Sequence, residues 1–314
     1  MDMRVLLLKG GDSSEREVSL MSGAAVEEAL GTAGIEFEGV VVSSLDDATG
    51  EIDAALSRAD GVPLVVFPVL HGGYGEDGRL QAVLEGKGVP FVGSGSKGCA
   101  LAMDKAASKD AMRRAGIPTP SYAVLSEKDD RGIPAGLRLP LVVKPVSEGS
   151  SVGMAIVSNP VEWASAVSAA FAFDAEVLVE EFIEGVEITV GVVEGETLPI
   201  VEIHYPGKIY DYDAKYEHRK GETVYLCPPE NLSAAAEKRA AETAVSFAKA
   251  IDSIPLTRVD MMVSGDEVFV LEANNIPGFT SHSLLPKAAA AAGTPFPALC
   301  AKLARSAAER SAGA

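Results

Sequence analysis

Residues 257–274 carry the side chains whose types and spacing are best suited to chemistry. Two apolar stretches flank a Ser-Gly-Asp turn, a pattern that predicts an antiparallel hairpin. Because side chains alternate along a strand, Arg258 and Asp260 share one face of the first strand. Glu272 and Asn274 likewise share one face of the second. Such oxygen ligands suit Mg²⁺ together with substrate phosphates, although a solvated face with an ordinary cross-strand ion pair has the same pattern.

A glycine- and serine-rich segment, residues 149–153, lies between two apolar runs. Glycines let backbone N–H groups approach phosphate oxygens closely, and serine hydroxyls add further donors. Lys144, on the preceding apolar run, would add positive charge. A tight hairpin beside a surface lysine fits the pattern equally well, so both interpretations stay open on these residues alone.

The same segment matches G-x-S-x-G, the nucleophile elbow of α/β-hydrolases, with Ser151 at its centre. Asp260 and His282 follow in the order Ser–Asp–His that this fold requires. The sequence thus offers a rival hypothesis, a serine hydrolase. The elbow must lead from a strand into a helix, whereas the residues that follow, 154–157, are strand-like. We therefore favour the phosphate-binding interpretation.

Three weaker patterns point toward ligand sites. Residues 93–98 fit G-x-G-x-x-G but follow the third apolar run rather than the first, so we interpret them as a turn between domains. Acidic residues at the end of segment 177–185 could hold an adenine and a ribose, or mark a hinge. His71 follows a buried apolar run, where α/β proteins place ligand sites, and a structural role is an equal alternative.

The elements that must position these residues begin with strand–helix alternation over residues 4–93. This alternation predicts an α/β domain with a parallel sheet. Ser14 followed by Glu17 matches a capping box and predicts a helix start at that point.

Two further blocks follow this domain. The second block is predicted to contain a helix at 100–116, strands on both sides of the glycine–serine loop, a helix at 159–171 and a strand at 175–183. The third is predicted to contain strands at 187–193 and 198–204, a polar loop at 205–231, a helix at 233–252, the hairpin and an alanine-rich helix.

Charge and composition exclude several classes of protein. The 314 residues are 47% hydrophobic, which supplies more than one core and is not typical of disordered chains. A formal net charge of −18 repels phosphate backbones, so we expect no nucleic-acid partner. The three cysteines form no CxxC pair, and we find no signal peptide and no apolar run of about 18 residues. We therefore expect a cytoplasmic protein with no membrane partner.

Eight segments, in one unbroken order over nearly the whole chain, closely resemble D-alanine–D-alanine ligases of the ATP-grasp superfamily. They are GGDSSEREVSL, LHGGYGEDG, FVGSG, ALAMDK, VVKPVSEGSSVGM, YDYDAKY, RVDMM and LEANNIPGFTSHS. The resemblance implies a fold of the α/β class, with an N-terminal Rossmann-like parallel-sheet domain at 1–98. A two-subdomain ATP-grasp fold would follow, with a central part at 99–185 and a C-terminal part at 186–314.

The resemblance also implies a nucleotide site and a metal site. ATP phosphates would be held by Lys105, Lys144 and Lys215, with Ser151 beside them. Adenine and ribose would be bound by Glu180 and Glu187, and by the chain at Glu181, Phe182 and Ile183. Two Mg²⁺ or Mn²⁺ ions would be held by Asp260, Glu272 and Asn274.

Two D-alanine molecules would be the substrates, and the resemblance implies further residues for them. The first would contact Glu15 and His71, and Ser150 and Tyr216 would close the site by bonding to Glu15. The oxyanion would be stabilised by Arg258 and the backbone N–H of Gly278. The second D-alanine's carboxylate would bind Ser283.

The implied reaction is ATP-dependent ligation through a D-alanyl phosphate, in peptidoglycan synthesis, by a homodimer. The loop at 205–231 would be its lid. A third hypothesis is an inactive, ATP-binding regulator, which would bind nucleotide without forming dipeptide. The presence of Lys144, Arg258 and Asp260 argues against it.

Overall fold

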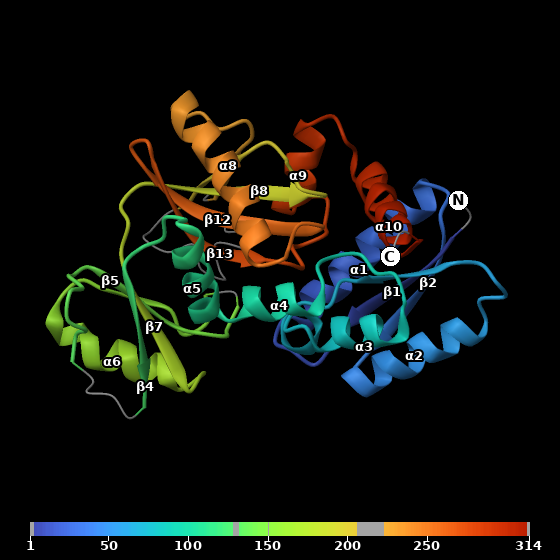
Figure 1. Cartoon of the computed structure of the whole chain (residues 1–314), viewed down its shortest axis with the longest axis horizontal. Helices are drawn as coiled ribbons and strands as arrows, with labels where there is room; N and C mark the ends of the chain where they lie inside the picture. Colours follow the sequence, from blue (N-terminus) through green and yellow to red (C-terminus); the bar gives the residue numbers. More distant parts are fainter. Residues whose placement is uncertain (1–2, 128–131, 150, 206–222, 313–314) are drawn as a thin grey trace.

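Three β-sheets organise the chain in the computed structural model, which describes residues 3–127, 132–149, 151–205 and 223–312 (Figure 1). One small sheet is parallel, and the other two are antiparallel. The α/β class and the parallel N-terminal sheet expected from the sequence are confirmed.

The N-terminal sheet has the strand order β2-β1-β3, and all of its pairs are parallel. The predicted strand at 89–93 contributes only an isolated parallel bridge between Val66 and Phe91. The elements of this part are β1 (Arg4–Gly10), α1 (Arg16–Thr32), β2 (Glu36–Val42), α2 (Leu45–Ser57), β3 (Leu64–Pro68), η1 (Gly73–Gly75) and α3 (Arg79–Lys87).

The capping box predicted at Ser14 is wrong. Helix α1 begins at Arg16 with Glu15 at its N-cap position, and the Glu15 side chain makes no capping hydrogen bond. The neighbouring Ser13 hydroxyl accepts from the Glu15 N–H at 3.1 Å and donates to the His71 carbonyl at 2.5 Å. A contact distant in sequence therefore sets this helix start.

The central sheet is antiparallel, with the strand order β4-β7-β5-β6. The predicted helix at 100–116 is two helices, because Asp104 ends α4 and its side chain accepts from the Ala107 N–H to cap α5. The elements here are α4 (Ser96–Met103), α5 (Lys105–Ala115), β4 (Tyr122–Ser126), β5 (Leu141–Pro145), β6 (Ala155–Val157), α6 (Pro160–Phe171) and β7 (Glu176–Glu181).

The third sheet is also antiparallel. Its main path runs β11-β10-β8-β12-β13, and α8 packs against it. The strands are β8 (Val186–Val193), β9 (Glu196–Thr197), β10 (Val201–His204), β11 (Val224–Leu226), β12 (Leu256–Ser264) and β13 (Glu267–Asn274). The helices are α8 (Ala234–Ala250), α9 (Leu284–Ala291) and α10 (Phe296–Ala312).

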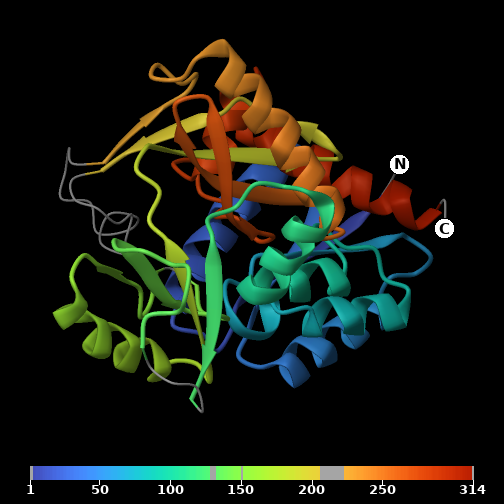
Figure 2. The same ribbon diagram turned by 60° about the vertical axis from the view of Figure 1, so that its left-hand side comes forward.

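The end of the chain returns to the N-terminal sheet. Side chains of α9 and α10 share one apolar core with β1, β3 and α1, and Figure 2 shows α10 in red beside these blue elements. Phe279 packs edge-on against Phe67 of β3, with ring centroids 5.5 Å apart. This packing holds the loop before α9 against the N-terminal sheet. The third sheet and the N-terminal sheet are therefore neighbours in the fold.

Candidate active site

Two adjoining cavities lie where the three sheets meet, with volumes of about 440 Å³ and about 390 Å³. Both lie within the range of small-molecule pockets. Lys105, Glu148, Gly149 and Glu272 line both of them. Ligands bound in the two cavities would therefore lie next to each other, on either side of these four shared residues.

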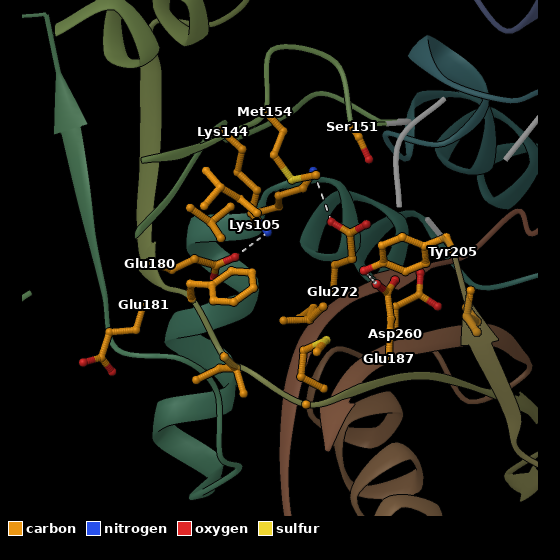
Figure 3. A pocket seen from close by; sticks show the side chains of 18 of the residues that line it. Lys105, Lys144, Ser151, Met154, Glu180, Glu181, Glu187, Tyr205, Asp260 and Glu272 are labelled. Carbon is orange, nitrogen blue, oxygen red and sulfur yellow. Dashed lines mark hydrogen bonds and ion pairs between the residues drawn. The ribbon is translucent and has the colours of Figure 1, made fainter. Parts of the chain in front are cut away.

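The first cavity gathers most of the residues predicted for nucleotide and metal binding (Figure 3). They come from helix α5, from the central sheet and its β5–β6 loop, from the chain that leaves β7, and from strands β8, β12 and β13. The predicted residues in its wall are Lys105, Lys144, Ser151, Glu180, Glu181, Phe182, Ile183, Glu187, Asp260 and Glu272.

Glu180 is buried at the back of this cavity between two lysines. Its Oε1 lies 2.6 Å from Lys144 Nζ, and its Oε2 lies 2.6 Å from Lys109 Nζ. Burial alone would raise the pKa of Glu180, but the two ammonium groups outweigh it and lower that pKa. Burial alone would lower the pKa of Lys144, and the Glu180 carboxylate outweighs it and raises that pKa. Both groups of the Lys144–Glu180 pair are therefore charged.

Lys105 joins the glycine–serine loop to the third sheet. Its Nζ donates to the Glu148 carbonyl at 2.5 Å and lies 3.7 Å from Glu272 Oε2. Ser151 lies between β5 and β6, which pair as an antiparallel hairpin, and not at a strand-to-helix turn. His282 lines the second cavity, whereas Ser151 lines the first. These placements oppose the serine-hydrolase hypothesis.

The hairpin of β12 and β13 forms as predicted. Asp260 pairs with Glu272, and Arg258 pairs with Asn274. The Arg258 Nε and Nη2 groups donate to the two Asp260 carboxylate oxygens at 3.0 and 2.9 Å. Asp260 also accepts from the Thr189 hydroxyl at 2.5 Å.

Asn274 Oδ1 bears on the predicted metal site. It is buried and has no hydrogen-bond partner among the residues that the structure describes. An unpaired buried oxygen is costly unless a ligand satisfies it. No group of three or more His, Cys, Asp and Glu side chains is gathered for a metal in the described part of the chain. Mg²⁺ needs only one or two carboxylates when phosphates complete its shell, so Asp260, Glu272 and Asn274 fit this ion.

At the other end of the first cavity, the Tyr205 hydroxyl donates to Glu187 Oε2 at 2.6 Å. Burial and the neighbouring Glu187 carboxylate raise the pKa of Tyr205. The N–H groups of Glu181 and Phe182 donate to the carbonyls of Ser121 and Pro140. These two amides therefore hold the chain after β7 in place, and a base beside Glu181 and Phe182 would have to bind to other groups.

The second cavity gathers the described residues predicted for the amino-acid substrates: Glu15, His71, Arg258, Gly278 and Ser283, with Asn274 of the metal set. His71 is buried, with 5% of the residue exposed. Its ring forms hydrogen bonds through Nε2 to Ser22 Oγ and through Nδ1 to the Ile276 carbonyl, both at 3.1 Å. His71 therefore fastens the loop before α9 to helix α1.

Gly278 and Gly149 lie where the walls of the second cavity come close together. A Cβ on Gly278 would lie 2.8 Å from Ser283 Oγ, so a larger residue would displace this hydroxyl. A Cβ on Gly149 would lie 3.4 Å from Glu15 Oε2, which places the glycine–serine loop directly beside the first turn of α1. The loop of the central sheet and the carboxylate of the N-terminal domain thus meet at one point.

Three predicted residues, Ser150, Lys215 and Tyr216, lie outside the described residues, as does most of the expected lid. Conversely, Lys109, Glu76 and Glu148 were not among the residues predicted for the site. Glu76 is buried beside His71, and burial raises the pKa of its carboxyl group. Its only sequence signal was its place in the LHGGYGEDG segment.

The sequence matches two family models, described as D-ala D-ala ligase N-terminus over residues 42–94 and D-ala D-ala ligase C-terminus over residues 111–305. It is 45% identical to a D-alanine--D-alanine ligase of Stutzerimonas stutzeri over 297 residues, which covers 93% of this chain and 90% of that protein. It is 41% identical to a D-alanine--D-alanine ligase of Alkalilimnicola ehrlichii, covering 99% of this chain and 96% of that protein.

Solved structures agree with this similarity. A Bacillus anthracis D-alanine--D-alanine ligase complexed with ATP has a TM-score of 0.80 at 32% identity, covering 99% of this chain and 98% of that one. The VanG D-Ala:D-Ser ligase of Enterococcus faecalis has the same TM-score at 31% identity, covering 96% and 98%. Among the described residues, no helix has the length and apolarity needed to span a membrane.

Proposed function

Because the chain belongs to the D-alanine–D-alanine ligase family, we propose that it joins two D-alanines at the expense of ATP for peptidoglycan synthesis. The observation that carries this proposal is the shared wall of the two cavities. Lys105, Glu148, Gly149 and Glu272 line both, so a nucleotide phosphate and an amino-acid carboxylate can meet there. Proximity of this kind is a large part of the rate enhancement of a two-substrate reaction.

The chemistry proceeds in two steps. A carboxylate oxygen of the first D-alanine attacks the γ-phosphorus of ATP, which forms a D-alanyl phosphate and releases ADP. The amine of the second D-alanine, having lost a proton, then attacks the acyl carbon. The amide bond forms as the carbon–oxygen bond to phosphate breaks and inorganic phosphate departs.

In the first cavity, Lys105 and Lys144 would bind ATP phosphates, with Ser151 and Lys215 beside them. Glu187 and the chain at 181–183 would hold the ribose and adenine. Since both oxygens of Glu180 pair with lysines, we propose that Glu180 orients Lys144 as well as bordering the adenine.

We propose that Asp260, Glu272 and Asn274 would hold two Mg²⁺ or Mn²⁺ ions. Asn274 Oδ1, buried and unpaired within the described residues, supports this assignment. Such ions, when bound, would offset negative charge on the phosphoryl group in transit.

In the second cavity, Glu15 would bind the first D-alanine's ammonium, with His71 beside it. Ser150 and Tyr216 would close the site against Glu15. Arg258 and the N–H of Gly278 would stabilise the oxyanion formed when the amine attacks. The second D-alanine's carboxylate would bind the Ser283 hydroxyl, which lies against Gly278.

We further propose three units, at 1–98, 99–185 and 186–314, in a homodimer that works in the cytoplasm, where ATP is supplied. Sedimentation of the purified chain tests the dimer.

An isotope experiment tests the acyl phosphate. D-alanine labelled with ¹⁸O in its carboxylate is incubated with ATP, and the released phosphate is analysed by mass. The phosphorylated oxygen leaves with phosphate in the proposed route, so one labelled oxygen is expected per inorganic phosphate. Unlabelled phosphate formed alongside dipeptide would contradict the route.

A further inference from the structure

Lys109 of helix α5 is a fully buried lysine behind the first cavity. Burial lowers the pKa of its ammonium group, and the adjacent Glu180 carboxylate opposes this shift and favours the charged form. Lys109 Nζ lies 2.6 Å from Glu180 Oε2 and donates to the Thr119 hydroxyl at 2.6 Å. Thr119 donates onward to the Val270 carbonyl of β13 at 2.7 Å. Lys109 is thus held by Glu180 of the central sheet and, through Thr119, by β13 of the third sheet. A buried ammonium is stable only when it is paired and hydrogen-bonded in this way.

The partner is Glu180, and through it Lys144. Glu180 offers one oxygen to each lysine, so the row Lys109–Glu180–Lys144 carries two positive charges and one negative charge. Without Lys109, Glu180 and Lys144 would form a closed pair with no net charge. With it, the row keeps a net charge of +1, and its cavity end is the Lys144 ammonium, which lines the first cavity.

The net charge of the Lys109–Glu180–Lys144 row matters because the chain as a whole carries a formal net charge of −18. A nucleotide triphosphate needs local positive charge to overcome that repulsion. In a water-poor wall, one uncompensated charge has a large effect on an anion nearby.

We propose that Lys109 is a positioning residue for ATP binding: by neutralising Glu180, it lets that carboxylate orient Lys144 without cancelling its charge toward the phosphates. Lys109 itself would touch neither ATP nor D-alanine. The inference rests on the proposed function, which assigns the first cavity to ATP.

The direct test is Lys109→Met, with ATP affinity measured by calorimetry and steady-state kinetics followed alongside. We expect the dissociation constant and the KM for ATP to rise about tenfold, the size of roughly one lost charge interaction in a buried site. The kcat at saturating ATP and the KM for D-alanine should stay within about twofold of wild type, because the lost interaction concerns ATP binding alone.

A second variant separates charge from packing. Adding Glu180→Gln to Lys109→Met returns the row to a net charge of +1, and the glutamine oxygen can still accept from Lys144. The double variant should then bind ATP at least about threefold more tightly than Lys109→Met, because residues in contact are energetically coupled. It should stay weaker than wild type, because the Glu180 carboxylate that borders the adenine is also lost. As a matched control, Thr119→Val removes the uncharged hydroxyl that accepts a hydrogen bond from Lys109, so it should lower the melting temperature without changing ATP affinity.

If Lys109→Met does not fold, Lys109→Gln keeps a hydrogen-bond donor to Glu180 but carries no charge, and the same outcomes apply.

Unchanged ATP affinity in the single variant, or a double variant that binds no more tightly than the single one, would overturn the inference. These outcomes are distinct from failure of the proposed function. In that case the wild-type protein itself would neither bind ATP nor form dipeptide.

Discussion

Asp260 lies directly opposite Glu272 in the pairing of β12 with β13, and the strand register shifts immediately after this pair. Irregular pairing of this kind re-aims side chains and is common beside active sites. Arg258 and Asn274 pair two residues further along each strand, on the same side of the shift. The four polar side chains are therefore concentrated at one end of the hairpin, where the two cavities meet.

Replacing Glu272 by Gln should abolish ligation and leave the melting temperature unchanged. The carboxylate borders both cavities and faces Asp260, and an amide is a much poorer ligand for a divalent cation. Glu267→Gln, at the exposed start of the same strand, is the matched control and should keep full activity. Dipeptide formation is measured over a range of Mg²⁺ concentrations. Near-normal activity of Glu272→Gln at limiting Mg²⁺ would remove this residue from the site.

Replacing Arg258 by Lys should lower kcat by roughly 10²-fold or more, the scale for losing one donor to an oxyanion. A single ammonium cannot reproduce the planar fork that grips both oxygens of Asp260. Arg305→Lys, on the exposed side of α10, should behave like wild type. Steady-state kinetics decide the matter, since an effect confined to KM would contradict the proposed role.

Replacing Glu15 by Gln should raise the KM for D-alanine by about tenfold or more, because one charge contact with an ammonium is lost. The KM for ATP should hardly change, since Glu15 lines only the second cavity. Glu17→Gln is the matched control, because Glu17 lies two residues further along the chain and its side chain is 84% exposed. The same KM for D-alanine in both variants would show that Glu15 does not bind the D-alanine ammonium.

Glu202 of β10 provides a test of stability against pH. Its carboxylate accepts from the N–H groups of Glu230 and Asn231, from the Asn231 side chain and from His204. Burial alone would raise the pKa of Glu202, but these hydrogen bonds outweigh it and lower that pKa. The ionised group therefore stabilises the fold above its ordinary pKa of 4.5, and this contribution is lost as the pH falls through the lower folded value.

Glu202→Gln should accordingly lower the free energy of unfolding by roughly 2 kcal/mol at pH 7, the scale for hydrogen bonds to a buried charged group. The difference from wild type should shrink as the pH is lowered below 4.5. Urea unfolding of both proteins at several pH values measures it, with the exposed Glu196→Gln as control. A difference that is independent of pH would show that the ionised carboxylate is not the cause.

Local patterns explain which parts of the fold the sequence could predict. The pairing of Arg258, Asp260, Glu272 and Asn274 followed from strand alternation around a short turn, and it is confirmed. Helix α6 was likewise predictable, because Asn159 begins it with a complete capping box. In these places the residues that decide the structure are close in sequence.

Predictions failed where distant contacts decide. The Ser14 capping box is wrong because the neighbouring Ser13 bonds to His71, far along the chain. The split of the predicted helix at Asp104 is a different case, because a local cap from Asp104 to Ala107 causes it and continuous helical periodicity hid it. No sequence pattern pointed to Lys109, and only the fold brings it to Glu180 and hence to Lys144.

The most direct test of the account is product formation by the purified protein. The protein is supplied with ATP and Mg²⁺, with and without an equal mixture of D-alanine, D-serine and D-lactate near pH 7, while phosphate release and product masses are followed. We predict that phosphate release depends on D-alanine and matches the D-alanyl-D-alanine formed, one for one. Phosphate release without any dipeptide, or a product that is mainly the D-lactate ester, would contradict it.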